Sequence, residues 1–197
     1  MSSSSDLRLL TWDSFSKSVV LCMSKLKIET FIGEEDITAP VYKIESFPIT
    51  SPLAVEKAQN ILEENEGDYL SGFVSLIYNE MVIFSEEQLT EDLLDTWCDL
   101  IYILNHRYDG RSIDITFLDN YKGNALVQEI GHFYEIQLNH LQRFLVPIEL
   151  FRNEVKKEFL NFVEFCKNEK LQFAEDSLYR GLLETYDELL YDEDERS

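Results

Sequence analysis

The chain has few of the residues on which disulfide-rich folds and metal sites depend. Its 197 residues include only three cysteines, three histidines, four prolines and seven glycines. Cys22, Cys98 and Cys166 are odd in number, far apart and surrounded by apolar neighbours. This pattern argues against a disulfide framework and against a C-x-x-C metal site. It indicates buried free thiols in a reducing compartment.

The sequence also lacks a long apolar segment. No apolar run is long enough to cross a bilayer, and the start MSSSSDLRLL has no basic stretch followed by a long apolar one. We therefore expect a cytoplasmic protein without membrane association. Hydrophobic residues make up 45% of the chain and aromatic residues 13%, which is enough for a folded core. We expect a disordered leader at 1–5, one domain at 6–190 and an acidic tail at 191–197.

Basic residues are scarce, and the resulting net charge of −21 is distributed unevenly. Residues 31–104 contain two basic and sixteen acidic side chains, and residues 171–197 contain two basic and nine acidic ones. No Lys or Arg occurs between Lys57 and Arg107, an interval with eleven acids. Such a field repels nucleic acid and speeds encounters with cationic partners, although acidic surfaces also improve solubility. The charge predicts a basic protein partner.

Recognisable catalytic and cofactor motifs are missing. The sequence has no G-x-S-x-G elbow, no GK[ST] phosphate loop and no His-x-x-x-His pair. Cys98 and His106 are eight residues apart on one expected helix, a rise of about 12 Å, so they cannot act as nucleophile and base. His132 and His140 have no evident third ligand. We predict no catalytic residue, no metal and no cofactor.

Periodicity and capping signals predict an α+β protein with a small, mainly antiparallel sheet, helices packed on one face and a helical C-terminal region. The expected strands are Val41–Phe47, a hairpin over Ser71–Phe84 with Asn79-Glu80 as its turn, Ile113–Phe117, and one or two strands in Ala125–Leu138 bent at Gly131. The expected helices are 51–67, 85–106, 147–168 and 172–190.

The helix expected after Ser85 has the strongest local signals. Ser85 and Gln88 match a capping box, and an apolar stripe from Leu89 to Leu104 follows at helical spacing. A second apolar stripe follows Pro147. The residues predicted to form the core are Leu93, Trp97, Ile101, Phe151, Phe159 and Phe162.

Acidic residues share a face of that expected helix. Glu91, Asp95 and Asp99 are spaced four apart, and Asp92 and Glu87 flank them. Like charges at this spacing cost a few tenths of a kcal/mol each, and no nearby Lys or Arg relieves them. We predict that these five residues bind a cationic partner. The alternative is that the folded core overrides a small surface cost and the acids serve solubility.

By its size, its acidity and the helix-then-strand stretch Leu93–Phe117, with Trp97 and the segment SIDITFLDN, the chain resembles bacterial immunity proteins of polymorphic or contact-dependent toxin systems. The resemblance implies an acidic cytoplasmic α+β protein that covers the basic active site of a nuclease toxin, and it carries over no functional residue. The sequence is also compatible with a nucleic-acid mimic, with an enzyme or enzyme subunit whose site is unrecognised, and with an oligomeric scaffold that uses helix 147–168 as its interface. The oligomeric state stays open.

Overall fold

Eight strands in two antiparallel sheets and four α-helices make up the part of the chain that a computed structural model describes: residues 24–35, 43–105, 112–118, 120, 123–138 and 141–194. The first sheet has the strand order β2-β1-β3-β4, and the second has the order β5-β6-β7-β8. The α+β class is thereby confirmed, with the strands divided between two sheets. The predictions for 1–5, 195–197, Cys22, His106 and His140 lie outside the described residues.

The strands are β1 (Leu26–Glu35), β2 (Ile44–Pro48), β3 (Gly72–Tyr78), β4 (Met81–Phe84), β5 (Ile113–Ile115), β6 (Ala125–Ile130), β7 (Phe133–Leu138) and β8 (Gln142–Pro147). The helices are α1 (Pro52–Glu64), the short 3-10 helix η2 (Glu86–Gln88), α2 (Leu93–Asn105), α3 (Ile148–Cys166) and α4 (Tyr179–Asp194).

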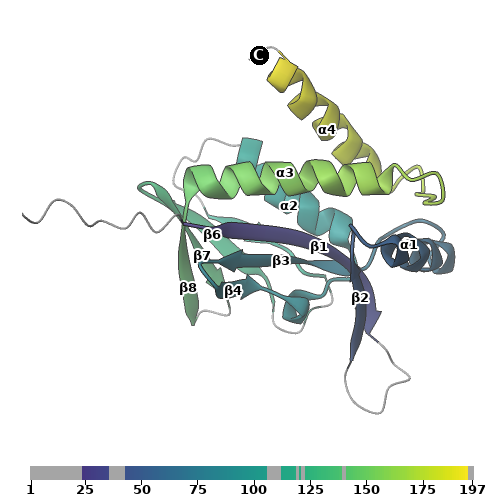
Figure 1. Cartoon of the computed structure of the whole chain (residues 1–197), viewed down its shortest axis with the longest axis horizontal. Coiled ribbons are helices and arrows are strands. Elements are labelled where there is room, and N and C mark those ends of the chain that lie inside the picture. The colour runs from purple at the N-terminus through teal and green to yellow at the C-terminus, as the bar shows by residue number, and fades with distance from the viewer. Residues whose placement is uncertain are drawn as a thin grey trace, which may run out of the picture.

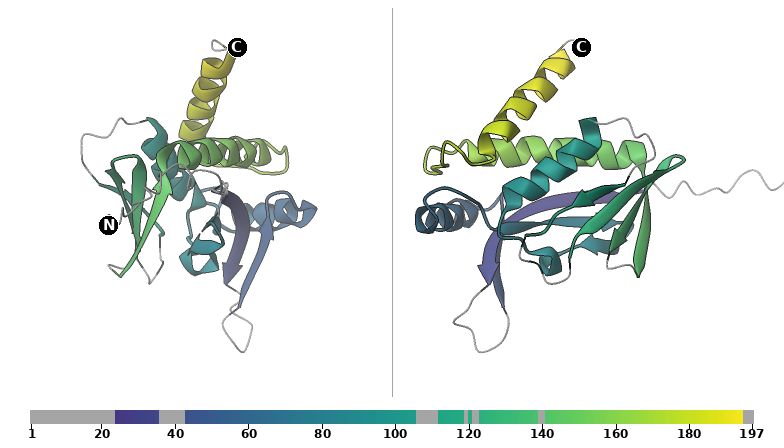
Figure 2. Two further views of the ribbon diagram at one scale, coloured as in Figure 1. Left: turned by 60° about the vertical axis from the view of Figure 1, so that its left-hand side comes forward. Right: turned by 180° about the vertical axis from the view of Figure 1, so that it is seen from behind.

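The long helix α3 holds the two sheets together. It lies along β1, and its N-terminal end packs against β7 and β8 (Figure 1). Helix α2 packs between α3 and the strands β3 and β5, on the far side in Figure 1 and in front in the right-hand view of Figure 2. All six predicted core residues are buried, and the rings of Trp97 and Phe162 stack with centroids 5.5 Å apart.

Within the described part of the chain, the α-helices that pack on β1 and β3 cover one face of the first sheet. Along β1 the side chains of Leu26, Ile28 and Ile32 are buried toward the helices, whereas Lys27 and Phe31 point to the other face. This alternation is the ordinary period of two along a strand. The side chains at the odd-numbered positions of β1 and β3 therefore form the surface of the uncovered face.

Local capping signals are confirmed where they act over a few residues. The Ser51 hydroxyl accepts a hydrogen bond from the backbone N–H of Leu53, and Pro52 is the first residue of α1. In the β3–β4 hairpin, Asn79 and Glu80 both adopt positive φ, at 46° and 68°. Two such residues are what a tight hairpin turn requires.

The single helix expected over 85–106 is wrong, because the chain forms two elements there. The capping box of Ser85 and Gln88 is present, but it caps only η2. Thr90 then leaves the helical path and exchanges two backbone hydrogen bonds with Gly72, at 2.8 and 3.0 Å. Its hydroxyl also accepts the N–H of Leu118 at 2.9 Å. Helix α2 starts afterwards, at Leu93.

The C-terminal helix begins later than the sequence predicts, at Tyr179 instead of Gln172. The preceding segment is held in an irregular path: Ala174 donates a backbone hydrogen bond to Gly67, and Phe173 stacks on Tyr179 with ring centroids 4.2 Å apart. Strand β8 was not predicted from the sequence.

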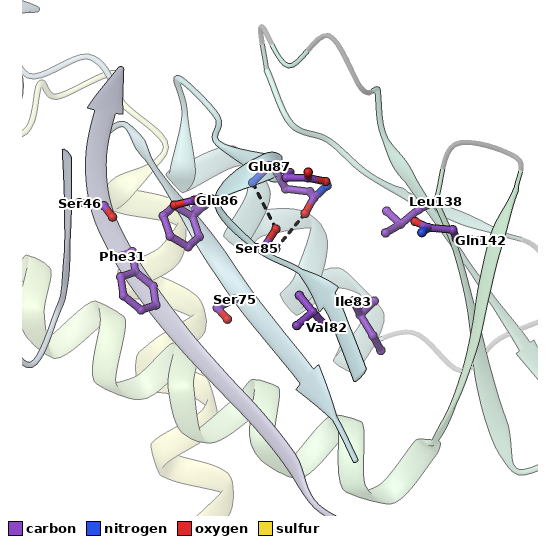
Figure 3. A pocket seen from close by; sticks show the side chains of 12 residues that line it. Phe31, Ser46, Ser75, Val82, Ile83, Ser85, Glu86, Glu87, Leu138 and Gln142 are labelled. Atoms are coloured by element: carbon purple, nitrogen blue, oxygen red, sulfur yellow. Dashed lines mark hydrogen bonds between the residues drawn. The ribbon is translucent and has the colours of Figure 1, made fainter. Parts of the chain in front are cut away.

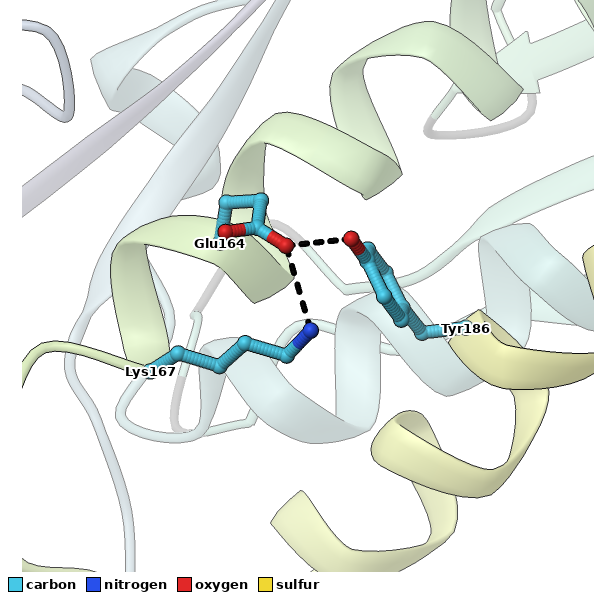
Figure 4. A network of polar contacts seen from close by, with 3 residues as sticks. All are labelled: Glu164, Lys167 and Tyr186. Atoms are coloured by element: carbon cyan, nitrogen blue, oxygen red, sulfur yellow. Dashed lines mark hydrogen bonds and ion pairs between the residues drawn. The ribbon is translucent and has the colours of Figure 1, made fainter. Parts of the chain in front are cut away.

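Helix α4 is attached to the end of α3 by a small polar network (Figure 4). The Tyr186 hydroxyl donates to the Glu164 carboxylate, and the Lys167 ammonium lies 3.1 Å from the same carboxylate. That ammonium also lies 3.6 Å from the centre of the Tyr186 ring. Beyond this contact α4 extends away from the body of the molecule (Figure 1).

Candidate protein-binding site

Three of the five predicted acidic residues come together around the first turns of α2. The charge of Asp95 acts on Asp92, and that of Asp99 acts on Asp95. Burial raises the pKa of Asp92, and the charge of Asp95 adds to the effect. Burial likewise raises the pKa of Asp95, and the charge of Asp99 raises it further. The cluster therefore concentrates negative charge at some electrostatic cost.

Two of these carboxylates also serve the fold. Asp92 accepts the backbone N–H of Leu94 at 3.0 Å, so it caps the start of α2. Asp99 accepts the backbone N–H of Thr116 at 2.7 Å, which ties α2 to the chain after β5. The sequence offered no explanation for Asp99, because this partner is seventeen residues away.

Asp95 differs from its two neighbours. Within the described part of the chain its side chain forms no hydrogen bond and no ion pair. Two described cations on α3 are engaged elsewhere: Arg152 donates to the carbonyl of Leu104, and Lys157 pairs with Glu154. Asp95 is thus a half-buried carboxylate, repelled by Asp99, without a described positive neighbour.

Glu87 and Glu91 are not on α2. Glu87 belongs to η2, where its backbone N–H donates to the Ser85 hydroxyl. Glu91 lies between η2 and α2, and its backbone N–H donates to the carbonyl of Leu118. Both side chains are exposed. The five acids therefore occupy a turn, a linker and a helix instead of one continuous helical face.

Glu87 also borders a groove that sequence reasoning missed. The groove has a volume of about 640 Å³ and lies on the uncovered face of the first sheet, between η2 and the adjoining ends of β7 and β8 at Leu138 and Gln142. Figure 3 shows Phe31, Ser46 and Ser75 on the sheet, Glu86 and Glu87 from η2, and Leu138 and Gln142 on the opposite wall.

The floor of the groove is aromatic. Phe31 on β1 and Phe73 on β3 face each other across the strand pair, and their rings stack with centroids 4.8 Å apart and planes 5° apart. Phe31 is only half buried. The one sequence signal was Phe31 itself, an aromatic residue two positions after Glu29 and four after Lys27, on the side of β1 that carries those charged side chains.

The thiols are unsuited to nucleophilic chemistry. Burial raises the pKa of Cys98 to about 11, with further contributions from Asp95, Asp92 and Asp99. Burial raises the pKa of Cys166 as well. Both thiols therefore stay protonated near neutral pH. Among the described residues there is no group of three or more metal-ligating side chains, and the predictions of no metal and no catalytic residue stay predictions.

Within the described ranges, no helix combines the length and the apolar character needed to cross a membrane. The chain matches no protein-family model, and no curated protein or solved structure is significantly similar to it. The resemblance to immunity proteins therefore stays a hypothesis.

Proposed function

We propose that the chain is an acidic binding protein that neutralises a basic protein partner, in the manner of an immunity protein that blocks a nuclease-type toxin. The observation that carries this proposal is Asp95. It lies between two carboxylates that are engaged in the fold, while its own side chain has no described partner. A cation supplied by another protein would relieve the repulsion that the fold leaves in place.

The distribution of charge supports the same function. The interval without Lys or Arg, from 58 to 106, includes η2 and all of α2, so these two elements contribute acidic side chains and no basic ones. Clustered charges of one sign raise association rates with oppositely charged proteins, and salt weakens the effect over about 10 Å at 0.1 M. Nuclease active sites are basic because they bind phosphate backbones.

An oligomeric scaffold receives no comparable support. Phe151, Phe159 and Phe162, the residues that would form its interface on α3, are buried within the chain. A second copy cannot reach them without disrupting the core.

Affinity purification from the cells that make the protein, followed by mass spectrometry, identifies the partner. The proposal expects a protein with a clear excess of Lys and Arg, whose nuclease activity falls to background when one equivalent of this chain is added. An inert basic protein of similar charge, such as a histone, serves as the control and should compete weakly. Recovery of a bound metabolite without any protein would favour an enzyme and contradict the proposal.

A further inference from the structure

The groove on the uncovered sheet face has the chemistry of a site for a cationic side chain. Its described lining includes two carboxylates, Glu86 and Glu87, and no Lys, Arg or His. Three serines, Ser46, Ser75 and Ser85, add hydroxyl groups. The Ser85 hydroxyl already accepts the N–H of Glu87, which fixes the acidic turn at the edge of the groove.

The aromatic floor narrows the choice of cation. The half-buried Phe31 stacks in parallel on the buried Phe73 and lines the floor of the groove, and Figure 3 shows Glu86 on the same side of the sheet as Phe31. A guanidinium group is planar, stacks on aromatic rings and donates several hydrogen bonds in one plane. An ammonium group is more strongly hydrated and offers no plane to stack.

Addition of a partner's strand is a poorer fit to this place. The neighbouring edge strand β4 has only four residues, and the β3–β4 pairing contains an irregularity between Leu76 and Ile77. Short and bulged edges discourage strand pairing. The groove is therefore suited to one inserted side chain rather than to an extended segment.

We propose that this groove binds an arginine side chain of the basic partner, with the guanidinium against Phe31 and its N–H groups directed to Glu86 and the serine hydroxyls. The inference rests on the proposed function and deepens it, because it assigns the partner's anchoring residue. Asp95 and its neighbours on α2 then supply attraction over a distance, whereas the groove supplies a specific contact.

Titration of the ¹⁵N-labelled full chain tests the groove without the natural partner. The probes are three short peptides of the pattern acetyl-Gly-X-Gly-X-Gly-amide, with X as arginine, lysine or citrulline. Citrulline keeps the planar shape of arginine and lacks its charge. The arginine peptide should cause saturable shifts at the amides of Phe31, Ser75 and residues 85–88. The lysine peptide should bind at least about threefold more weakly than the arginine peptide, and the citrulline peptide should not bind measurably.

Variants decide whether the shifts come from the proposed contacts. Glu86→Gln should lower the affinity for the arginine peptide by about fivefold, and Phe31→Ser should lower it by a similar factor. Glu86 is exposed, so the first variant keeps the fold even if Phe31→Ser does not. Glu188→Gln, an exposed acid on α4, is the matched charge control. Leu145→Ser is the apolar control on the second sheet. Neither control should change the affinity.

The groove inference would be overturned if citrulline bound as well as arginine, or if the shifts persisted unchanged in Glu86→Gln. Arginine shifts confined to residues around Asp95 would also overturn it, and they would leave the proposed function standing. Another outcome would support the groove and contradict the proposed function. A groove that binds arginine, in a chain whose natural partner is neutral or acidic, would sustain the site and reject the proposed function.

Discussion

At the scale of single residues, Trp97 is the largest fully buried side chain among the described residues. It is fully buried and packs against Phe159 and Phe162 from α3. Its indole N–H is buried and has no hydrogen-bond partner among the described residues. The ring therefore stabilises the fold through its buried apolar area, whereas burial of the unpaired N–H lowers the free energy of unfolding by about 1–3 kcal/mol.

Replacing Trp97 should separate these two contributions. We expect Trp97→Ala to lower the free energy of unfolding by about 3–5 kcal/mol, because it leaves a large cavity. Trp97→Phe should cost much less, since it keeps most of the ring and removes the unsatisfied N–H. Urea unfolding monitored by circular dichroism measures both values. Equal losses in the two variants would mean that the indole N–H has a partner that stabilises the fold.

Glu158 is a buried carboxyl between α3 and the first sheet. It accepts the backbone N–H of Thr30 at 2.8 Å and a side-chain N–H of Asn161 at 3.2 Å. Burial nevertheless raises its pKa above the ordinary 4.5. The folded chain then holds this proton to a higher pH than the unfolded chain does. The contribution to stability is greatest below pH 4.5 and is lost as the pH rises through the raised pKa.

The Glu158→Gln variant should remove this pH dependence, because the amide keeps an acceptor for Thr30 and does not ionise. We expect the free energy of unfolding of the variant, minus that of the natural chain, to increase as the pH rises from 4.5. Glu164→Gln provides a contrast with the opposite sign. Hydrogen bonds from Tyr186 and Lys167 lower the pKa of Glu164, so its contribution is present above 4.5 and is lost in acid. Parallel pH profiles for both variants would contradict these assignments.

At the scale of elements, Gly67 joins the end of α1 to the segment before α4. Its φ is +86°, and its backbone N–H donates to the carbonyl of Leu62 at 2.8 Å. A Cβ at this position would lie 2.6 Å from the carbonyl oxygen of Gln172 and 2.7 Å from the backbone nitrogen of Ala174. Both the backbone conformation and the contact therefore require glycine.

Gly67→Ala should destabilise the chain by about 1–3 kcal/mol through strain and displacement of the segment at 172–174. Gly131→Ala is the matched control. Gly131 also has positive φ, at 62°, but a Cβ there would meet nothing within 4 Å. Thermal unfolding compares the two variants. A loss no larger than that of Gly131→Ala would show that the contact with 172–174 is dispensable.

The elements show which parts of the fold could be predicted from sequence. Signals that act within four residues, such as the Ser51 cap, the Asn79-Glu80 turn and the Ser85–Gln88 box, are present as expected. The prediction was wrong where a distant partner outweighed a local preference. Thr90 interrupts the expected helix because Gly72 and Leu118 satisfy its polar groups. No local pattern contains that information.

At the scale of the whole molecule, the local features of the candidate site could be predicted from sequence, and the features that depend on distant segments could not. Spacing along one helix correctly placed Asp95 and Asp99 together, since residues four apart are neighbours on a helix. The groove could not be predicted, because β1, β3, η2 and the ends of β7 and β8 meet there only after the two sheets have formed. The acidic charge was evident from composition, and its arrangement required the fold.

The central claim is that the acidic side chains of α2 attract a basic protein partner. Charge reversal at Asp95 tests this claim most directly. Reversal of Asp99 is unsuitable, because its carboxylate holds the N–H of Thr116 and the variant would also loosen α2. Asp95→Lys changes the charge at a side chain with no described hydrogen bond. Glu188→Lys makes the same change at an exposed position on α4.

The measurement is the association rate with the purified natural partner, by stopped-flow fluorescence at several salt concentrations. We predict that Asp95→Lys lowers the rate at low salt by about tenfold and flattens its salt dependence, while Glu188→Lys changes the rate by less than about twofold. Equal rates for Asp95→Lys and the natural chain at every salt concentration would contradict the account and assign the acids of α2 to solubility.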